Sequence, residues 1–396
     1  MVPEGWHVKS VGDICTFING HGFKSQDWSD CGLPIIRIQN LNGSESFNFY
    51  DGAIKKQWLV NPGDILFAWA GTKGVSFGAK LWKGPKGVLN QHIFRVEPKL
   101  KVDHTWLYFA MLSVTKRVEE KAHGFKSTLV HVQKSDVTEQ VVLVPPLDEQ
   151  KKIAQVIYTW DEAVRTCERL LSNSRQQKRG LLQQLLNGKR RFNSESGRGF
   201  PAWKEEKVGN FLRLHKEYVP ASTKLPILTS SRDGLYEQER SVINEGKYGV
   251  IPFGYFTYRH MSDDLIFKFN LNREWEKGAI SKEYPVFSAS GVDKDFLEAQ
   301  LNHGDAFKRF AIQQKQGGTR TRLYFRNLCE FRFAIPCLEE QEKIATALSV
   351  ANQEIEVVKK KVECIKHERN ALMQQLLTGK RRVDSGDFQC EKVGEV

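Results

Sequence analysis

Residues 145–154 read PPLDEQKKIA, and residues 336–345 read PCLEEQEKIA. Each stretch opens a longer block, which closes as LLQQLLNGKRR at residues 181–191 and as LMQQLLTGKRR at residues 372–382. Gln150 and Gln341 near the start are 191 residues apart, and so are Gly188 and Gly379 near the end. Loops of related segments vary in length, so a block without insertions over this distance indicates a continuous helix that occurs twice.

Both copies have the seven-residue periodicity of a coiled coil. In each copy, one set of mostly apolar positions recurs every seven residues, and a second set follows four residues after the first. In the first copy these positions are Ile153, Ile157, Trp160, Val164, Cys167, Leu171, Ser174, Lys178, Leu181 and Leu185. In the second copy they are Ile344, Leu348, Ala351, Ile355, Val358, Val362, Ile365, Arg369, Leu372 and Leu376. Heptads sustained over this length predict two helices that pair along an apolar seam.

The ends of both helices are marked in the sequence. A proline precedes each start, acidic residues occupy each first turn, and a glycine followed by Lys-Arg-Arg closes each block. Acidic residues favour the positive N-terminus of a helix, and glycine favours the left-handed conformation that ends one. Each helix therefore spans roughly 38 residues, or about 57 Å at 1.5 Å per residue. An isolated helix depends on packing for its stability, and short connections favour an antiparallel pair of the two copies.

Both copies place a cation on the seam at the same position, Lys178 in the first and Arg369 in the second. Two interpretations remain open. A long basic side chain near a helix end can cover apolar surface while its charge stays in water, which is the commoner case. The alternative is a site for an acidic group from a partner.

Composition limits the class of protein. A chain of 396 residues exceeds one ordinary domain, so two or more are expected. The net charge of +12 points to a polyanionic partner, with nucleic acid as the first candidate and an acidic membrane surface as the second. No apolar run is long enough to span a bilayer, and no signal peptide follows Met1. Seven scattered cysteines favour free thiols in a reducing, cytoplasmic location.

The chain divides into two globules that alternate with the two helices, which makes the fold class α+β. The expected parts are a mixed α/β globule at 1–144, the first helix at 145–191, a polar linker at 192–199, a second globule at 200–335, the second helix at 336–382 and a tail at 383–396. In the first globule, β-rich runs at 35–38, 64–69, 92–96 and 141–144 predict strands, and His104–Lys121 predicts a helix. In the second, strands are expected within 224–229, 248–259 and 331–335.

Short echoes extend the repeat beyond the helices. The second globule opens at Trp203 with a stretch that resembles the one beginning at Trp6, 197 residues earlier. Residues 391–394 in the tail read EKVG, as do residues 206–209. Four residues can match by chance. If the match is real, the tail packs against the first globule as the start of a further repeat, and the arrangement closes into a ring.

No motif indicates a catalytic site. The Gly-Lys pairs lack the upstream glycine and the hydroxyl of a P-loop, and no Asn/Asp-Pro-Pro-aromatic motif of an adenine methyltransferase is present. Glu205 and Lys207 form at most half of a nuclease motif, since no strand with a partner aspartate precedes them. Histidines and cysteines are not spaced as metal ligands. The sequence thus excludes an enzyme of these classes and predicts no bound metal or cofactor.

Basic, amide and hydroxyl residues in glycine-rich loops are the remaining candidates for function. Such side chains read base edges and hold phosphates. In the first globule they are Lys24, Ser25, Arg37, Gln39, Asn40, Thr72, Lys73, Asn90, Gln91, His92, Lys126 and Ser127. In the second they are Ser230, Ser231, Arg232, Tyr258, Arg259, His260, Lys315, Arg320 and Arg322. For each residue alone, a solvent-exposed or turn-forming role is the commoner one. As a set on a basic chain they favour binding of double-stranded DNA.

The two helix starts, Pro-x-Leu-(Asp/Glu)-Glu-Gln-x-Lys-Ile-Ala, and the two ends, Leu-(Asn/Thr)-Gly-Lys-Arg-Arg, resemble the specificity subunit of type I restriction-modification enzymes. Smaller echoes of this family are PIIRIQNL at residues 34–41 and NQH at residues 90–92. Cys337 departs from the usual second proline of the motif. The resemblance implies two target-recognition domains that each read one half of a split, asymmetric DNA site, with the antiparallel helices as the ruler between them.

The resemblance also implies partners. Modification subunits, which carry S-adenosylmethionine and methylate adenine, dock on the helices, and restriction subunits with ATP and Mg²⁺ join them. The chain itself would be non-catalytic and hold no cofactor. Candidate docking residues on the helices are Glu149, Gln150, Ile153, Lys178, Glu340, Gln341, Ile344 and Arg369.

Two other functions stay open. One is a stand-alone structural or regulatory DNA-binding protein with a coiled-coil spacer, for which salt-sensitive, sequence-indifferent binding would be the sign. The other is a nuclease or methyltransferase in its own right, which the missing motifs disfavour.

Overall fold

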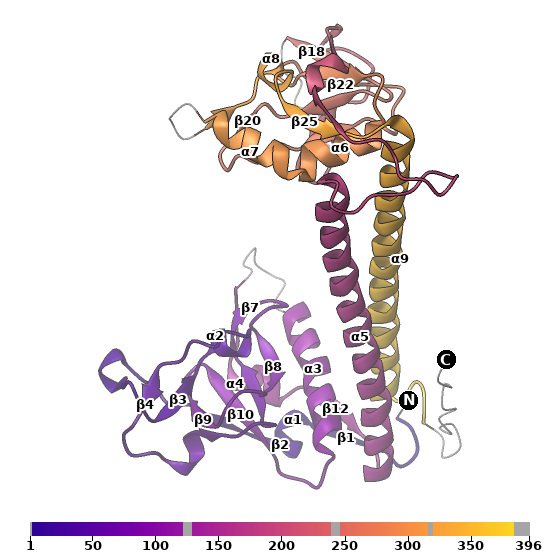
Figure 1. The fold of residues 1–396 in the computed structure, drawn as a ribbon. Helices are drawn as coiled ribbons and strands as arrows, with labels where there is room; N and C mark the ends of the chain where they lie inside the picture. The colour runs from indigo at the N-terminus through magenta and orange to yellow at the C-terminus, as the bar shows by residue number, and fades with distance from the viewer. Residues whose placement is uncertain (1, 122–128, 239–245, 316–319, 384–396) are drawn as a thin grey trace. The chain divides into compact units, whose positions relative to one another are not determined.

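The computed structural model describes residues 2–121, 129–238, 246–315 and 320–383 (Figure 1). The chain forms two compact units. Unit 1 consists of Met1–Cys167 and Lys361–Val396, and unit 2 consists of Glu168–Lys360. The predicted boundaries separated globules from helices, whereas the structure divides each long helix between the two units. None of the described helices combines the length and the apolar composition that crossing a bilayer requires.

The two long helices are α5 (Leu147–Leu186) and α9 (Leu338–Leu377), each of 40 residues. All twenty predicted seam positions are buried or half-buried, which confirms the heptad assignment. Gly188 (φ +66°) and Gly379 (φ +67°) adopt the left-handed conformation. Behind them, Arg190 N–H donates to the Gln184 carbonyl and Arg381 N–H to the Gln375 carbonyl. These bonds satisfy carbonyl groups that a helix end leaves free, so both C-termini end as the sequence predicts.

Unit 1 holds a four-stranded antiparallel sheet in the order β2-β10-β6-β8, with α3 packed against it. A second sheet has the order β4-β3-β9-β5, and β1 pairs with β12 and β7 with β11. The strands are β1 (His7–Ser10), β2 (Cys15–Asn19), β3 (Leu33–Ile36), β4 (Phe49–Tyr50), β5 (Leu59–Val60), β6 (Ile65–Ala68), β7 (Ala70–Thr72), β8 (Gly78–Leu81), β9 (Gly87–Leu89), β10 (Ile93–Pro98), β11 (Leu129–His131) and β12 (Val141–Val144). The helices are α1 (Val11–Ile14), α2 (Ile38–Leu41), α3 (His104–Lys121) and α4 (Lys134–Thr138), with short 3-10 turns η1 (Ser25–Asp27) and η2 (Lys56–Trp58).

Unit 2 repeats the main sheet and the two short ladders of unit 1, but in place of a second four-stranded sheet it has the sheets β15-β18-β22 and β16-β17. Its sheet β14-β23-β19-β21 has the strand order of β2-β10-β6-β8, β13 pairs with β25, and β20 pairs with β24. The strands are β13 (Lys204–Lys207), β14 (Leu212–His215), β15 (Tyr218–Pro220), β16 (Leu228–Ser230), β17 (Leu235–Glu237), β18 (Lys247–Pro252), β19 (Phe256–Tyr258), β20 (Met261–Ser262), β21 (Phe269–Leu271), β22 (Lys277–Ser281), β23 (Val286–Ala289), β24 (Thr321–Arg322) and β25 (Arg332–Ile335). The helices are α6 (Lys294–His303), α7 (Asp305–Gln313) and α8 (Phe325–Leu328), with a turn η3 (Val208–Asn210).

Most predicted elements are present with shifted ends. The helix His104–Lys121 is confirmed to the residue. The run at 35–38 is only half strand, because β3 ends at Ile36 and α2 begins at Ile38. The run at 224–229 forms a strand only from Leu228, while 248–259 splits into β18 and β19. In unit 2 the counterpart of α3 is broken at Gly304 into α6 and α7, which the sequence interpretation did not anticipate.

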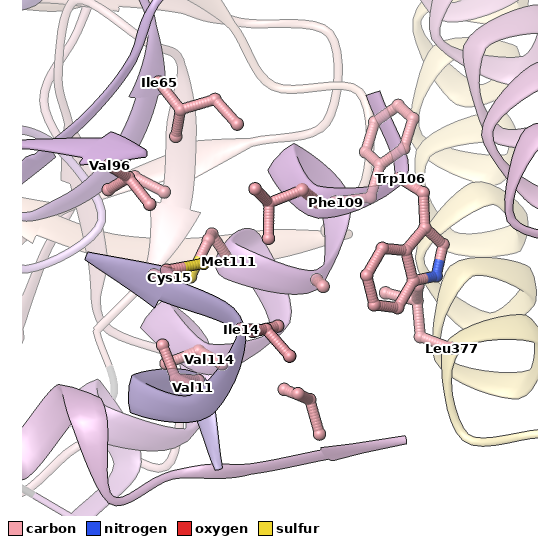
Figure 2. Packing of buried hydrophobic residues seen from close by; sticks show 14 of the residues in the cluster. Val11, Ile14, Cys15, Ile65, Val96, Trp106, Phe109, Met111, Val114 and Leu377 are labelled. Carbon is pink, nitrogen blue, oxygen red and sulfur yellow. The ribbon is translucent and has the colours of Figure 1, made fainter. Parts of the chain in front are cut away.

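The core of each unit includes one half of each long helix. In unit 1, Ile153 and Ile157 from the start of α5 join Leu376 and Leu377 from the end of α9. Figure 2 shows Leu377 beside Trp106 of α3 in this core. In unit 2, the end of α5 and the start of α9 pack in the same way around Leu185. The start of one helix thus always packs with the end of the other, so the pairing is antiparallel, as predicted.

Candidate nucleic-acid interface

A buried carboxylate near each helix start holds the two helices to the globule. In unit 2, Arg191 donates to both oxygens of Glu340, at 3.0 Å from Nε and 2.7 Å from Nη2. The indole N–H of Trp203 donates to the same carboxylate at 3.0 Å. The Glu340 side chain is fully buried, and its hydrogen bond and charge raise the pKa of Arg191. A bidentate arginine and an indole together satisfy a charge that would be costly to bury alone.

Unit 1 contains the same arrangement at equivalent positions. Arg382 donates to both oxygens of Glu149 at 2.9 Å, and the indole N–H of Trp6 donates to that carboxylate at 2.9 Å. Arg382 also donates to the Glu4 carbonyl, just as Arg191 donates to the Pro201 carbonyl. The last arginine of each Lys-Arg-Arg is therefore structural, a role that the sequence interpretation missed.

The glutamine after each of these glutamates connects the start of its long helix to the start of a second helix of the same unit, α3 or α6. Gln150 accepts from the N–H of Asp103, and Gln341 accepts from the N–H of Asp293, at 2.8 and 2.9 Å. Asp103 and Asp293 in turn accept from amides in the first turns of α3 and α6. Both glutamines are almost completely buried.

Six of the eight predicted docking residues on the helices are buried. Glu149, Gln150, Ile153, Glu340, Gln341 and Ile344 were expected to contact a partner, yet all six are buried and used inside the chain. Side chains that are already buried and hydrogen-bonded present no surface to another subunit, so the helix-start motif explains the internal packing instead. Arg369 is also paired within unit 1, whereas Lys178 lies in a cavity of unit 2.

A short strand ladder carries polar residues at the same place in both units. In unit 1, β7 pairs with β11, and Val132 N–H donates to the carbonyl of Trp69, the residue before β7. In unit 2, β20 pairs with β24, and Leu323 N–H donates to the carbonyl of His260, the residue before β20. Trp69 and His260 are therefore structurally equivalent. We call this ladder with its flanking loops the reading edge of each unit.

The reading edge of unit 1 is aromatic and rich in imidazole. The Trp69 ring lies 5.0 Å from the His92 ring and 4.9 Å from the His131 ring. Its indole N–H donates to the Gln91 carbonyl, and the Gln91 amide lies 3.1 Å from His92 Nε2. Gln91 and His92 were predicted site residues, as were Thr72, the last residue of β7, and Lys73, which follows it. Trp69 and His131 were missed because Trp69 was assigned to a strand and neither residue belongs to a motif.

Arg37 and Asn90 come together at a second place in unit 1. They follow β3 and β9, which are parallel neighbours, so both lie at the carboxyl ends of adjacent strands. The Arg37 guanidinium lies 4.5 Å from the ring of exposed Trp28. Arg37 Nε, Asn90 Oδ1 and His92 Nδ1 are buried polar atoms without a protein partner. Buried polar atoms normally have partners, so these three atoms are exceptions in the packing of this place.

The reading edge of unit 2 is basic and lines a cavity of about 370 Å³. Five predicted residues meet in its wall, namely Ser230, Ser231, Arg232, Arg259 and Arg320. Two of the arginines are held by aspartates: Arg232 donates to Asp264 at 2.6 Å and Arg320 to Asp263 at 3.0 Å. Arg259 is exposed, and His260 and exposed Arg322 lie on the adjoining ladder.

Several predicted site residues serve other purposes. Asn40 is buried and donates to the carbonyls of Ser44 and Ser46, so it shapes the turn after α2. Tyr258 is fully buried, its hydroxyl donates to the Leu323 carbonyl, and burial raises its pKa strongly. Neither presents its polar group to a ligand, because both satisfy it within the core. Ser230 is likewise buried and accepts from Asn270 at 2.8 Å.

The remaining predicted residues lie on exposed segments outside these two edges. Lys24, Ser25 and Gln39 flank or lie within the turns η1 and α2, and Lys315 follows α7. Lys126, Ser127 and the tail sequence at 391–394 lie outside the described residues. The arrangement as a whole offers donors, acceptors and flat rings on two equivalent edges, which suits the reading of base edges.

Comparisons with known proteins agree in family and in fold. The family description "Type I restriction modification DNA specificity domain" matches residues 3–172 and 281–367. The chain is 23% identical to the type I restriction enzyme MjaVIII specificity subunit of Methanocaldococcus jannaschii, over 98% of this chain and 95% of that protein.

Two solved structures share the fold. The HsdS subunit from Thermoanaerobacter tengcongensis is 15% identical, with a TM-score of 0.52 over 96% of this chain and 98% of that one. A chain from a structure described as showing complex assembly and conformational transition of the type I R-M system is 14% identical, with a TM-score of 0.63 over 96% of this chain and 100% of that one.

Proposed function

This chain belongs to the type I restriction modification DNA specificity domain family, and we propose that it is the DNA specificity subunit of a type I restriction-modification complex. In this role it is not an enzyme. Each unit reads one half of a bipartite, asymmetric DNA site through its reading edge. The paired helices set the spacing between the half-sites.

One observation carries this proposal. The two units share the strand order of the main sheet, the position of the reading edge, and the buried glutamate with its arginine and tryptophan, which we call the Trp–Glu–Arg anchor. The edge of unit 1 presents Trp69, His92 and His131, whereas that of unit 2 presents Arg259 and Arg322. A common scaffold with different side chains at the recognition position suits a protein that reads two different sequences. The two half-sites should therefore differ, and the site should not be palindromic.

The reading edges support two modes of recognition. Arginine pairs best with guanine in the major groove, so unit 2 is suited to a half-site that contains guanine. In unit 1, the exposed Gln91 amide can both donate and accept, and amide side chains pair best with adenine.

The partners follow from the proposed role. We propose that modification subunits bind the helical framework and bring S-adenosylmethionine, while restriction subunits bring ATP and Mg²⁺. The family match and the likeness to a chain from a structure of type I R-M complex assembly support this proposal.

An exchange of reading edges tests the proposal. Residues 200–335 would be replaced by the corresponding region of a relative with a different specificity, and methylated sites would be mapped in cells that also hold the modification subunit. One half of the methylated site should change while the other half and the gap remain. The matched control exchanges residues 1–144 and should alter the opposite half. A change in both halves after either exchange, or sequence-indifferent methylation, would refute independent reading.

A further inference from the structure

The two seam cations occupy equivalent positions of the repeat but differ in their surroundings. In unit 1, Arg369 Nε donates to Asp161 Oδ1 at 2.7 Å. Its guanidinium carbon lies 5.8 Å from the centre of the Phe109 ring. Only 14% of the Arg369 side chain is exposed. The cation of unit 1 is therefore paired and covered within the chain.

Unit 2 lacks the carboxylate of that pair. The offset of 191 residues that relates Lys178 to Arg369 also relates Asn352 to Asp161. Lys178 and Asn352 line the same cavity. An amide at this place carries no charge, so the helix opposite Lys178 supplies no counter-ion.

Unit 2 also lacks the covering ring. Helices α3 and α6 are aligned by their N-caps, Asp103 and Asp293, since both bind the equivalent glutamines. In this alignment Ala299 takes the place of Phe109. The missing ring leaves space, and a cavity of about 410 Å³ opens between α5, α6 and α9.

Two lysines of the cavity have no counter-ion in the part of the chain that the structure describes. Lys178 and Lys268 both line it, and no ion pair of either lysine is found among the described residues. Asp295 and Glu298 also line the cavity, but both bind Arg273 in the same wall. Burial, and then the charge of Lys268, lowers the pKa of Lys178, as expected for an ammonium group without an acidic partner.

We propose that this cavity receives a carboxylate side chain of a partner protein, which completes in trans the ion pair that Asp161 completes within unit 1. Under the proposed function, on which this inference rests, that partner is the modification subunit. A protein side chain suits the site better than duplex DNA, because Lys178 lies half-buried among three helices. A single flexible side chain reaches such a recess, whereas the backbone of a duplex contacts protruding side chains.

The proposal makes the two ends of the framework unequal as docking sites. The pseudo-equivalent place in unit 1 is already filled by Asp161 and Phe109, so it has no need of an acid from outside. A modification subunit bound at unit 2 gains an ion pair that one bound at unit 1 does not.

Two variants of the full chain test this through the affinity for purified modification subunit, measured by calorimetry at low and high salt. Lys178→Met removes the cation and should weaken the tighter binding step about tenfold, which corresponds to about 1.4 kcal/mol. Asn352→Asp supplies the carboxylate internally, as in unit 1, and should weaken the same step severalfold. Arg175→Met removes an exposed charge from the same helix and is the control, with affinity expected to be unchanged.

Two further readouts use the isolated chain. Asn352→Asp should raise the thermal unfolding midpoint by about 2 °C, because it pairs an unpaired cation. The His303 ring lines the cavity, and burial together with the charges of Lys268 and Lys178 lowers its pKa to about 4. Asn352→Asp should raise this pKa, because it adds a negative charge nearby. Proton NMR of the His303 ring follows this titration.

The outcomes separate this inference from the proposed function. If the wild-type chain does not bind modification subunit, both are wrong. If it binds and Lys178→Met binds equally well, only the cavity proposal is wrong. If Lys178→Met instead loses affinity for duplex DNA in the absence of modification subunit, the anion is a phosphate and the proposal is overturned.

Discussion

The two Trp–Glu–Arg anchors are alike, whereas the two reading edges differ, so the two repeats agree at buried positions and diverge at exposed ones. The anchors match atom for atom: Trp6, Glu149 and Arg382 in unit 1 form the same hydrogen bonds as Trp203, Glu340 and Arg191 in unit 2. The edges share only their backbone ladder. A buried carboxylate is stable only if every partner is present, so its neighbours cannot change singly. Exposed side chains on a fixed ladder have no such constraint and can differ freely.

The largest effect is expected from a change of helix length. Four residues inserted after Leu171 add about 6 Å of helix and rotate the following residues by roughly 40° relative to the seam. The insertion lies in the part of α5 that belongs to unit 2, so unit 1 stays intact as an internal reference. Mapping of methylated sites should show a gap longer by one or two base pairs, or no methylation at all. A seven-residue insertion, which preserves the heptad phase, is the control for lost seam packing. An unchanged gap with full affinity would show that the helices do not set spacing.

The anchors should differ in strength because they differ in burial. Glu340→Ala leaves Trp203 and Arg191 without their acceptor and should destabilise unit 2 by about 3 kcal/mol. Glu149→Ala should cost unit 1 less, about 2 kcal/mol, because Arg382 is 44% exposed while Arg191 is 31% exposed, so water compensates Arg382 better. Urea unfolding of each variant gives the two values. Equal losses would mean that burial does not decide the strength of the anchor.

Acid should weaken unit 2 more than unit 1. Burial, followed by the charges of Lys268 and Lys178, lowers the pKa of His303 from 6.5 to about 4. Between these values the unfolded ring binds a proton that the folded ring does not, so stability falls as the pH drops from 6.5 towards 4. Amide hydrogen exchange at pH 7 and pH 5 should show α6 losing more protection than α3, which has Ser113 at the equivalent place. His303→Gln should remove the difference, and equal losses in the unchanged protein would contradict the assignment.

The smallest effect is expected from a circular permutation. Arg382 contacts the Glu4 carbonyl in unit 1 as Arg191 contacts the Pro201 carbonyl in unit 2, where an unbroken linker joins the two contacting residues. Joining the termini by a short flexible linker and reopening the chain between Ser194 and Ser196 should keep the stability within about 1 kcal/mol and leave the methylated sequence unchanged. Copurification with the modification subunit followed by methylation mapping is the measurement. A soluble permutant that binds no partner would show that the two connections are not equivalent.

Much of the framework was predictable because it depends on local rules. The heptads, the acidic first turns and the glycine ends place α5 and α9 without any knowledge of their surroundings, and the span of α3 follows from its apolar side. The candidate site was predicted less well, since residue type alone does not reveal burial. Asn40 and Tyr258 have the side chains of DNA-reading residues but satisfy them inside the core, and Trp69 and His131 show no motif.

The sequence alone therefore determined the duplicated helix, the alternation of globule and helix, and the basic character of the chain. These features follow from periodicity, composition and repeat, which are properties of neighbouring residues. Only the tertiary structure decided that the helix-start glutamates bind residues far along the chain and that each unit includes half of each helix. The tertiary structure also decided that Arg369 is paired with a carboxylate while Lys178 lies in a cavity and has no such partner among the described residues. These features depend on contacts between residues about 140 to 230 positions apart, such as Trp6 with Glu149 and Glu149 with Arg382. No local sequence pattern encodes which of two equivalent cations pairs with a carboxylate.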